Sequence, residues 1–173
     1  PLMNAKHKHI IAAALGALLF AGSVPAAGPV KSVDQSAPLV LLDCSFDLAD
    51  PGAGERSYAA GHLAGALYVH LDRDLSGTKT GSNGRHPLPE RQALAEHAGA
   101  WGIAPGVQVV CYDAQGMPYA ARAWWLLRWL GHEAVAVLDG GPTAWLAAGG
   151  SLASDTPLPQ AQPPYPPQPA AMP

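Results

Sequence analysis

The segment Cys111 to Arg122, CYDAQGMPYAAR, brings a thiol, a carboxylate and an arginine close to a short turn that contains glycine. The apolar run from Val107 to Tyr112 predicts a buried strand, and the apolar residues from Met117 to Leu130 predict a helix. Successive N–H groups in a turn between a strand and a helix form a nest that binds anions, and the helix dipole reinforces it. A cysteine at the first position of such a turn would be held as a thiolate and would be a nucleophile.

The first position of this turn is occupied by Asp113 and not by a cysteine. Cys111 comes two residues earlier, inside the predicted strand, so it shares a face with Asp113 but lies one layer deeper. We therefore expect Cys111 to be a small buried side chain, with a role as nucleophile as the alternative. The carboxylate of Asp113 can itself accept N–H groups of the turn and the helix, as an N-cap does. The loop consists of Asp113, Ala114, Gln115, Gly116, Met117 and Pro118, and its proline removes one N–H from the nest.

Segments with strand-like and helix-like patterns alternate along the chain. The predicted strands are residues 38–43, 65–70, 107–112 and 134–138, and the predicted helices are residues 55–60, 90–101, 117–130 and 142–148. This alternation predicts an α/β domain with a mostly parallel central sheet and helices on both faces. Active sites in such domains lie beyond the carboxyl ends of the strands. The loops that meet this condition are residues 44–53, 70–89, 113–118 and 139–142.

The composition fits one globular domain and argues against several kinds of function. The chain has 173 residues, 49% of them apolar, and a formal net charge of −3 at pH 7, which suits a single core. No run of Lys or Arg marks a surface for nucleic acid. Cys44 and Cys111 are the only cysteines, too few for a disulfide framework or a four-ligand zinc site. We expect both to be free and buried, and we expect no metal and no cofactor.

The two ends of the chain differ from the predicted domain. A basic start from Met3, an apolar run from Ile10 to Gly22, and Val24 and Ala26 at the −3 and −1 positions of a cut after Ala26 are typical of a cleaved signal peptide. A membrane-spanning helix would need about 20 apolar residues, so we expect membrane contact only during export. The end of the chain is rich in proline and predicts an extended linker or tail without helix or sheet.

These patterns divide the chain into four parts. We expect a leader at residues 1–27, a linker at 28–37, the domain at 38–151 and a proline-rich linker or tail at 152–173. Because the chain starts ahead of Met3 and ends in a linker, we expect a truncated piece of a longer protein. It would be exported to the periplasm if the leader works, and cytoplasmic otherwise.

Five motifs follow one another between residues 39 and 150: LLDCSFDLADP, RSYAAGHLAGALYVHLDRDLSG, GRHPLP, YDAQGMPYAARAWWLLRWLGH and LDGGPTAWLAAGG. In this order they resemble the rhodanese-like domain, and specifically the N-terminal half of the two-domain thiosulfate and 3-mercaptopyruvate sulfurtransferases. The resemblance implies a catalytic second domain, in which a cysteine takes up sulfur as a persulfide and passes it to cyanide or another thiol. First domains of that family commonly carry an aspartate at the corresponding place, which is Asp113 here.

The resemblance implies that this chain is a non-catalytic N-terminal domain, inactive alone, whose partner is a catalytic C-terminal rhodanese domain. A carboxylate has no thiolate with which to form the S–S bond of a persulfide. One alternative is an exported rhodanese-homology module that binds a partner or acts as a scaffold. Another is a thiol enzyme that uses Cys111. A phosphatase of related fold would need an arginine where this chain has Met117, and is therefore rejected.

Four further residues are candidates for contact with a substrate or with the second domain: Arg56, Arg85, His86 and Arg122. We expect Arg56 to pair with Asp43 and to steady the loops on the substrate side. Arg85 and His86 lie in a polar loop from which they could reach the second domain or an anionic substrate. Arg122 is expected to donate a structural salt bridge, with a substrate clamp as the alternative.

Overall fold

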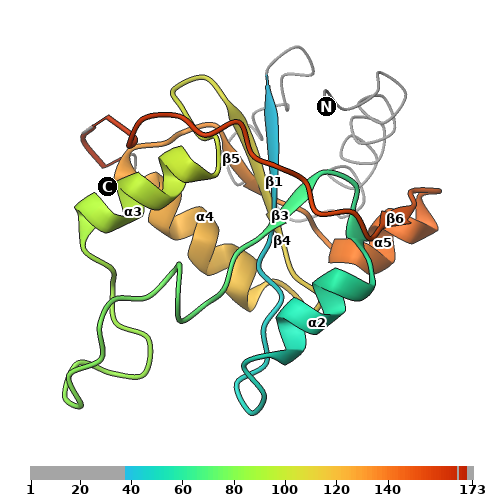
Figure 1. Cartoon of the computed structure of the whole chain (residues 1–173), viewed down its shortest axis with the longest axis horizontal. Coiled ribbons are helices and arrows are strands. Elements are labelled where there is room, and N and C mark those ends of the chain that lie inside the picture. Colours follow the sequence, from blue (N-terminus) through green and yellow to red (C-terminus); the bar gives the residue numbers. More distant parts are fainter. Residues whose placement is uncertain (1–37, 167, 171–173) are drawn as a thin grey trace, which may run out of the picture.

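The computed structural model describes residues 38–166 and 168–170 (Figure 1). In this part of the chain four parallel strands form the central sheet, in the order β3-β1-β4-β5. They are β1 (Leu39–Asp43), β3 (Ala66–Tyr68), β4 (Gln108–Tyr112) and β5 (Val135–Val137). The predicted parallel α/β sheet is therefore confirmed, and β4 is one of its two inner strands.

Helices cover both faces of this sheet. Helices α3 (Arg91–Ala100) and α4 (Pro118–Leu130) lie on one side, and α2 (Ala53–Ala60) and α5 (Gly141–Ala147) lie on the other (Figure 1). Helix α4 begins with Pro118 in its first turn, where a missing N–H costs no hydrogen bond. Because α4 starts directly after the loop that follows β4, the first turn of this helix lies at the carboxyl edge of the sheet.

Each inner strand contributes to two apolar cores. Leu42 and Val109 belong to the larger core, under α3 and α4, whereas their neighbours Leu41 and Val110 belong to the smaller core with Trp145 of α5. Side chains that alternate along a strand point to opposite faces. Because both faces are covered, β1 and β4 are apolar apart from Asp43 at the end of β1 and Gln108 at the start of β4, and this apolar run made them predictable.

Two very short strands were not predicted from the sequence. Strands β2 (His62–Leu63) and β6 (Leu152–Ala153) form an antiparallel pair beside the main sheet. A strand of this length has no periodic pattern from which it could be recognised. The pair ties the start of the proline-rich segment to the chain that follows α2.

The proline-rich segment lies against the domain instead of hanging free. Residues 157–166 contain neither helix nor strand, as predicted. They nevertheless cross the domain from β6 to α3, as the red trace in Figure 1 shows. Tyr165 is only 4% exposed and belongs to the larger core. The sequence pattern had predicted only a linker or tail at this place.

Some expectations concern residues that the structure leaves undescribed. The predicted leader and the linker after it, residues 1–37, lie outside the described residues. Within residues 38–166 and 168–170, no helix is both long and apolar enough to cross a membrane.

Candidate functional site

Asp113 occupies the centre of the loop between β4 and α4. It is 3% exposed, and its Oδ1 accepts the N–H groups of Gln115 and Met117 at 2.9 and 2.8 Å. Its Oδ2 accepts the N–H groups of Tyr119 and Ala120, both at 2.9 Å. These are the bonds expected of a carboxylate in the nest, so both of its oxygens are already engaged by the loop and by the first turn of α4.

The turn has an unusual backbone that Asp113 helps to hold. Gly116 and Met117 both have left-handed conformations, with φ of 84° and 85°. For a non-glycine residue such as Met117 this costs about 1–2 kcal/mol. The hydrogen bond from the Met117 N–H to Asp113 offsets part of that cost, and the Met117 side chain is 40% exposed.

Both cysteines are free and fully buried below this loop. Cys111 lies within β4 and belongs to the larger core, as predicted. Cys44 follows β1, and contact with Cys111 together with burial raises the pKa of its thiol. A thiol with a raised pKa in an apolar environment is a poor nucleophile.

The loop after β1 supports the loop after β4. Ser45 Oγ accepts the N–H of Ala114 at 3.1 Å, and the side-chain oxygen of Gln115 accepts the N–H of Phe46 at 3.3 Å. Ser45 is itself fixed by Asp43, whose Oδ1 accepts its N–H at 2.9 Å. Sequence analysis missed Ser45 and Gln115 as loop-positioning residues, because the adjacency of β1 and β4 in the sheet has no local signal.

The predicted pair of Asp43 and Arg56 is wrong. Asp43 ends the buried strand β1 and is 4% exposed, and burial raises the pKa of its carboxyl. Arg56 lies on the exposed side of α2 and pairs instead with Asp50. Since both partners of that pair are mostly exposed, it contributes little to stability. Arg56 therefore pairs with an exposed residue of the loop after β1 and not with the buried end of β1.

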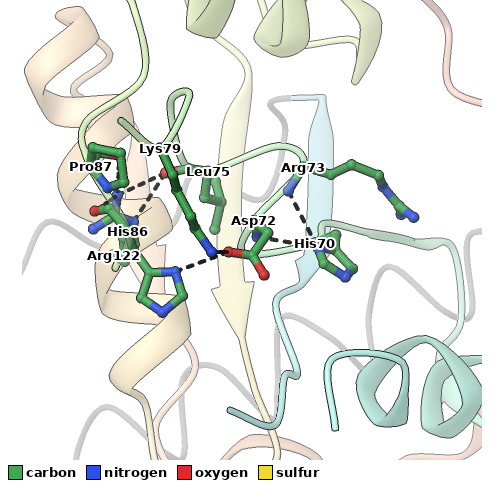
Figure 2. Close-up of polar contacts among 8 residues, drawn as sticks. All are labelled: His70, Asp72, Arg73, Leu75, Lys79, His86, Pro87 and Arg122. Carbon is green, nitrogen blue, oxygen red and sulfur yellow. Dashed lines mark hydrogen bonds and ion pairs between the residues drawn. The ribbon is translucent and has the colours of Figure 1, made fainter. Parts of the chain in front are cut away.

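Arg122 joins α4 to the long loop that follows β3. Its guanidinium donates to the carbonyl oxygens of Leu75 and His86, each at 3.0 Å, and to that of Pro87 at 3.1 Å (Figure 2). Burial lowers the pKa of Arg122. These contacts are structural, as expected, but the expected salt bridge is wrong, because the acceptors of Arg122 are backbone carbonyls.

His86 forms a polar cluster with the start of the same loop. Its Nδ1 donates to Asp72 Oδ1 at 3.1 Å, and Lys79 donates to the same oxygen at 2.8 Å (Figure 2). The Lys79 ammonium lowers the pKa of the Asp72 carboxyl, and His86 acts in the same direction. His86 Nε2 is buried and has no hydrogen-bond partner among the described residues. The neighbouring Arg85 is exposed.

The structure thus brings some of the predicted site residues together and separates others. Asp113 binds the first turn of α4, a helix that also carries Arg122 further along, and Arg122 binds the segment that carries His86. Arg56 stands apart. Among the described residues no group of three or more His, Cys, Asp or Glu could hold a metal ion.

Comparisons with known proteins agree with this geometry. The family model for the rhodanese-like domain matches residues 30–148. The "probable 3-mercaptopyruvate sulfurtransferase" of Pseudomonas aeruginosa is 50% identical over 116 residues, which are 66% of this chain and 41% of that protein. The "putative thiosulfate sulfurtransferase SseB" of Mycobacterium tuberculosis is 40% identical over 134 residues, 78% of this chain and 46% of that protein.

A solved structure, the 3-mercaptopyruvate sulfurtransferase from Leishmania major, matches with a TM-score of 0.64 and 32% identity. The match covers 83% of this chain and 38% of that one. The chain therefore spans less than half the length of these relatives.

Proposed function

This chain belongs to the rhodanese-like domain family, and we propose that it is the non-catalytic N-terminal half of a two-domain sulfurtransferase. Two kinds of finding support the proposal. The two bacterial relatives are named as sulfurtransferases, and the chain covers 41% and 46% of their lengths. In addition, the nest that could stabilise a sulfur nucleophile is filled by the carboxylate of Asp113.

The four N–H bonds to Asp113 are the observation that carries the proposal. In sulfur transfer from thiosulfate, a thiolate attacks the outer sulfur, the S–S bond of thiosulfate breaks, and sulfite leaves with the bonding electron pair. The enzyme then holds a persulfide anion, which a nest of N–H groups stabilises. Asp113 occupies that nest with oxygens that cannot take up sulfur in this way, so this domain has no nucleophile where one is needed.

The carboxyl edge of the sheet also presents apolar side chains that suit a second domain. The loops that follow β1 and β4 expose Leu48 and Met117, which are 49% and 40% exposed. Loops after parallel strands share one edge of the sheet, and Met117 directly precedes the first residue of α4 at this edge. We assign this edge as the face that meets the catalytic domain.

His86 holds the loop after β3 from within. Its Nδ1 is bound to Asp72, and its Nε2 is buried without a hydrogen-bond partner among the described residues. We therefore give His86 a positioning role in this loop. Arg85, which is exposed next to it, is placed to attract an anionic substrate.

A thiocyanate assay tests the proposal. The purified chain is mixed with cyanide and either thiosulfate or 3-mercaptopyruvate, and thiocyanate is measured for the wild type and for Cys111→Ser. We expect neither protein to exceed the rate without protein. The longest product of the same gene should be active, through a cysteine outside residues 1–173. Turnover by the chain itself that disappears in Cys111→Ser would refute the proposal and identify a thiol enzyme.

A further inference from the structure

We propose that the surface formed by α3 and the end of α4 is a binding site for an extended proline-rich segment, and that its occupant is the chain's own residues 157–166 and 168–170. We call this segment the strap. The contacts of the strap are independent of the proposed function, so the binding site does not depend on whether this chain is one half of a two-domain sulfurtransferase. It assigns a defined docking site to a segment whose composition alone indicates a flexible linker.

The backbone of the strap is bonded to α3 at two points. The N–H of Gln162 donates to the carbonyl of Gly99 at 2.8 Å, and the N–H of Tyr165 donates to the carbonyl of Ala95 at 2.9 Å. The residues between them are prolines, which have no N–H to donate. The strap therefore uses both of the N–H groups available in this stretch to bind the helix.

Tyr165 anchors the strap in the larger core. Its side chain is 4% exposed, and its hydroxyl forms a hydrogen bond of 3.1 Å with Nδ1 of His132, directly after the cap of α4. The two rings meet edge to face with their centroids 5.4 Å apart. A tyrosine bound by both its ring and its hydroxyl is a specific anchor, since either contact would be lost in a different register.

Glycines line the path of the strap and allow it to approach closely. A Cβ atom at Gly99 would lie 2.4 Å from the carbonyl oxygen of Pro163, and one at Gly131 would lie 2.4 Å from Cβ of Gln168. Gly99 is the informative position, because it lies within α3 and has an ordinary helical backbone. The three nearest atoms to its added Cβ all belong to the strap, so the strap is what requires a glycine here.

Arg91 fixes the far end of the strap. Its guanidinium donates to the carbonyl of Gln168 and to that of Leu130, and it lies 5.7 Å from the ring centre of Trp129. Arg91 therefore holds residue 168 beside the end of α4, at the edge of the sheet opposite the loop that holds Asp113.

The substitution Gly99→Ala tests the proposal through the sign of its effect. Without a bound strap, alanine within a helix should raise the melting temperature, because glycine is the poorer helix former. With the strap bound, the new methyl group meets the Pro163 carbonyl, so we expect a lower melting temperature. In a Tyr165→Ala background, where the strap is released, the same change should cost less or become stabilising. A higher melting temperature in the wild-type background would overturn the proposal.

Residue-resolved hydrogen exchange of the unmodified chain supplies a test that needs no variant. We expect the amides of Gln162 and Tyr165 to be protected, and the amide of Leu158, whose side chain is 80% exposed, to serve as the unprotected reference. Tyr165→Phe removes only the hydroxyl and should retain the protection of Gln162 in part. If Gln162 and Tyr165 exchange as fast as Leu158 while α3 stays protected, the strap is not bound.

Discussion

At the scale of single residues, Asp113 decides both the chemistry and the stability of its loop. Its carboxylate is surrounded by backbone donors from the turn and from α4, and it compensates for the left-handed backbone of Met117. A cysteine in this place would be a nucleophile with a weaker hold on the same donors. An aspartate here therefore holds the loop more firmly than a cysteine would, but it cannot act as a sulfur nucleophile.

Replacing Asp113 by alanine should lower the free energy of unfolding by about 2–4 kcal/mol, because four N–H groups lose a charged acceptor and only some of them can turn to water. Asp113→Asn is the matched control. It keeps one acceptor oxygen and should lose about half as much. Urea unfolding followed by circular dichroism measures both. A loss of less than about 0.5 kcal/mol for Asp113→Ala would show that the nest does not depend on this side chain.

His132 gives a pH dependence whose sign follows from its burial. Burial lowers the pKa of His132 below its usual 6.5, so the unfolded chain takes up a proton before the folded one as the pH falls. Stability is therefore complete above about pH 6.5 and is lost as the pH falls below it. The urea midpoint of the wild type should decrease between about pH 7.5 and about pH 5.5 by more than that of His132→Gln. Equal decreases would show that another group is responsible.

At the scale of elements, the site is built by loops that brace one another. The loop after β1 holds the loop after β4 through Ser45 and Gln115, and Arg122 of α4 holds the loop after β3 through three carbonyls. The strands that carry these loops were predictable from their apolar runs. The bracing contacts were not, because they depend on which strands are neighbours and on the acceptors that a side chain finds in space.

Arg122→Ala should release the loop at residues 70–89 while the domain stays folded. The three carbonyl oxygens would lose their donor. A lysine at position 122 could not replace it either, because an ammonium group lacks the planar fork of a guanidinium. We expect faster hydrogen exchange across residues 75–88 and a loss of about 1–3 kcal/mol in the free energy of unfolding. Arg85→Ala, at the exposed neighbour of His86, is the control and should leave exchange in this loop unchanged. Unchanged exchange in Arg122→Ala would mean that the loop is held by other contacts.

The limits of prediction differ from one element to another for physical reasons. The position of Asp113, and not Cys111, at the start of the loop could be predicted, because the apolar pattern of the strand shows where the loop begins. The partner of Arg56 was not, because Asp43 and Asp50 are both near in the sequence and only burial distinguishes them. The docking of the strap was hidden because proline-rich composition describes local stiffness and says nothing of a surface built by α3 and α4.

At the scale of the whole molecule, the rhodanese-like domain has two opposite edges with different features. The carboxyl edge carries the filled nest and the exposed side chains of Leu48 and Met117, and it is the edge that we propose meets a catalytic domain. The strap crosses the other end, where it is bound to α3 and to the residues that follow α4. The proposed function follows from this arrangement, because the carboxylate of Asp113 occupies the nest in which a sulfur nucleophile would lie.

Sulfur loading is the most direct test of that account. The purified chain is incubated with thiosulfate, freed of excess donor and weighed by intact-protein mass spectrometry under non-reducing conditions. We predict that the mass of the wild type is unchanged and equals that expected from its sequence. A gain of one sulfur atom that is absent in Cys111→Ser would contradict the account, because it would place a working nucleophile inside the domain.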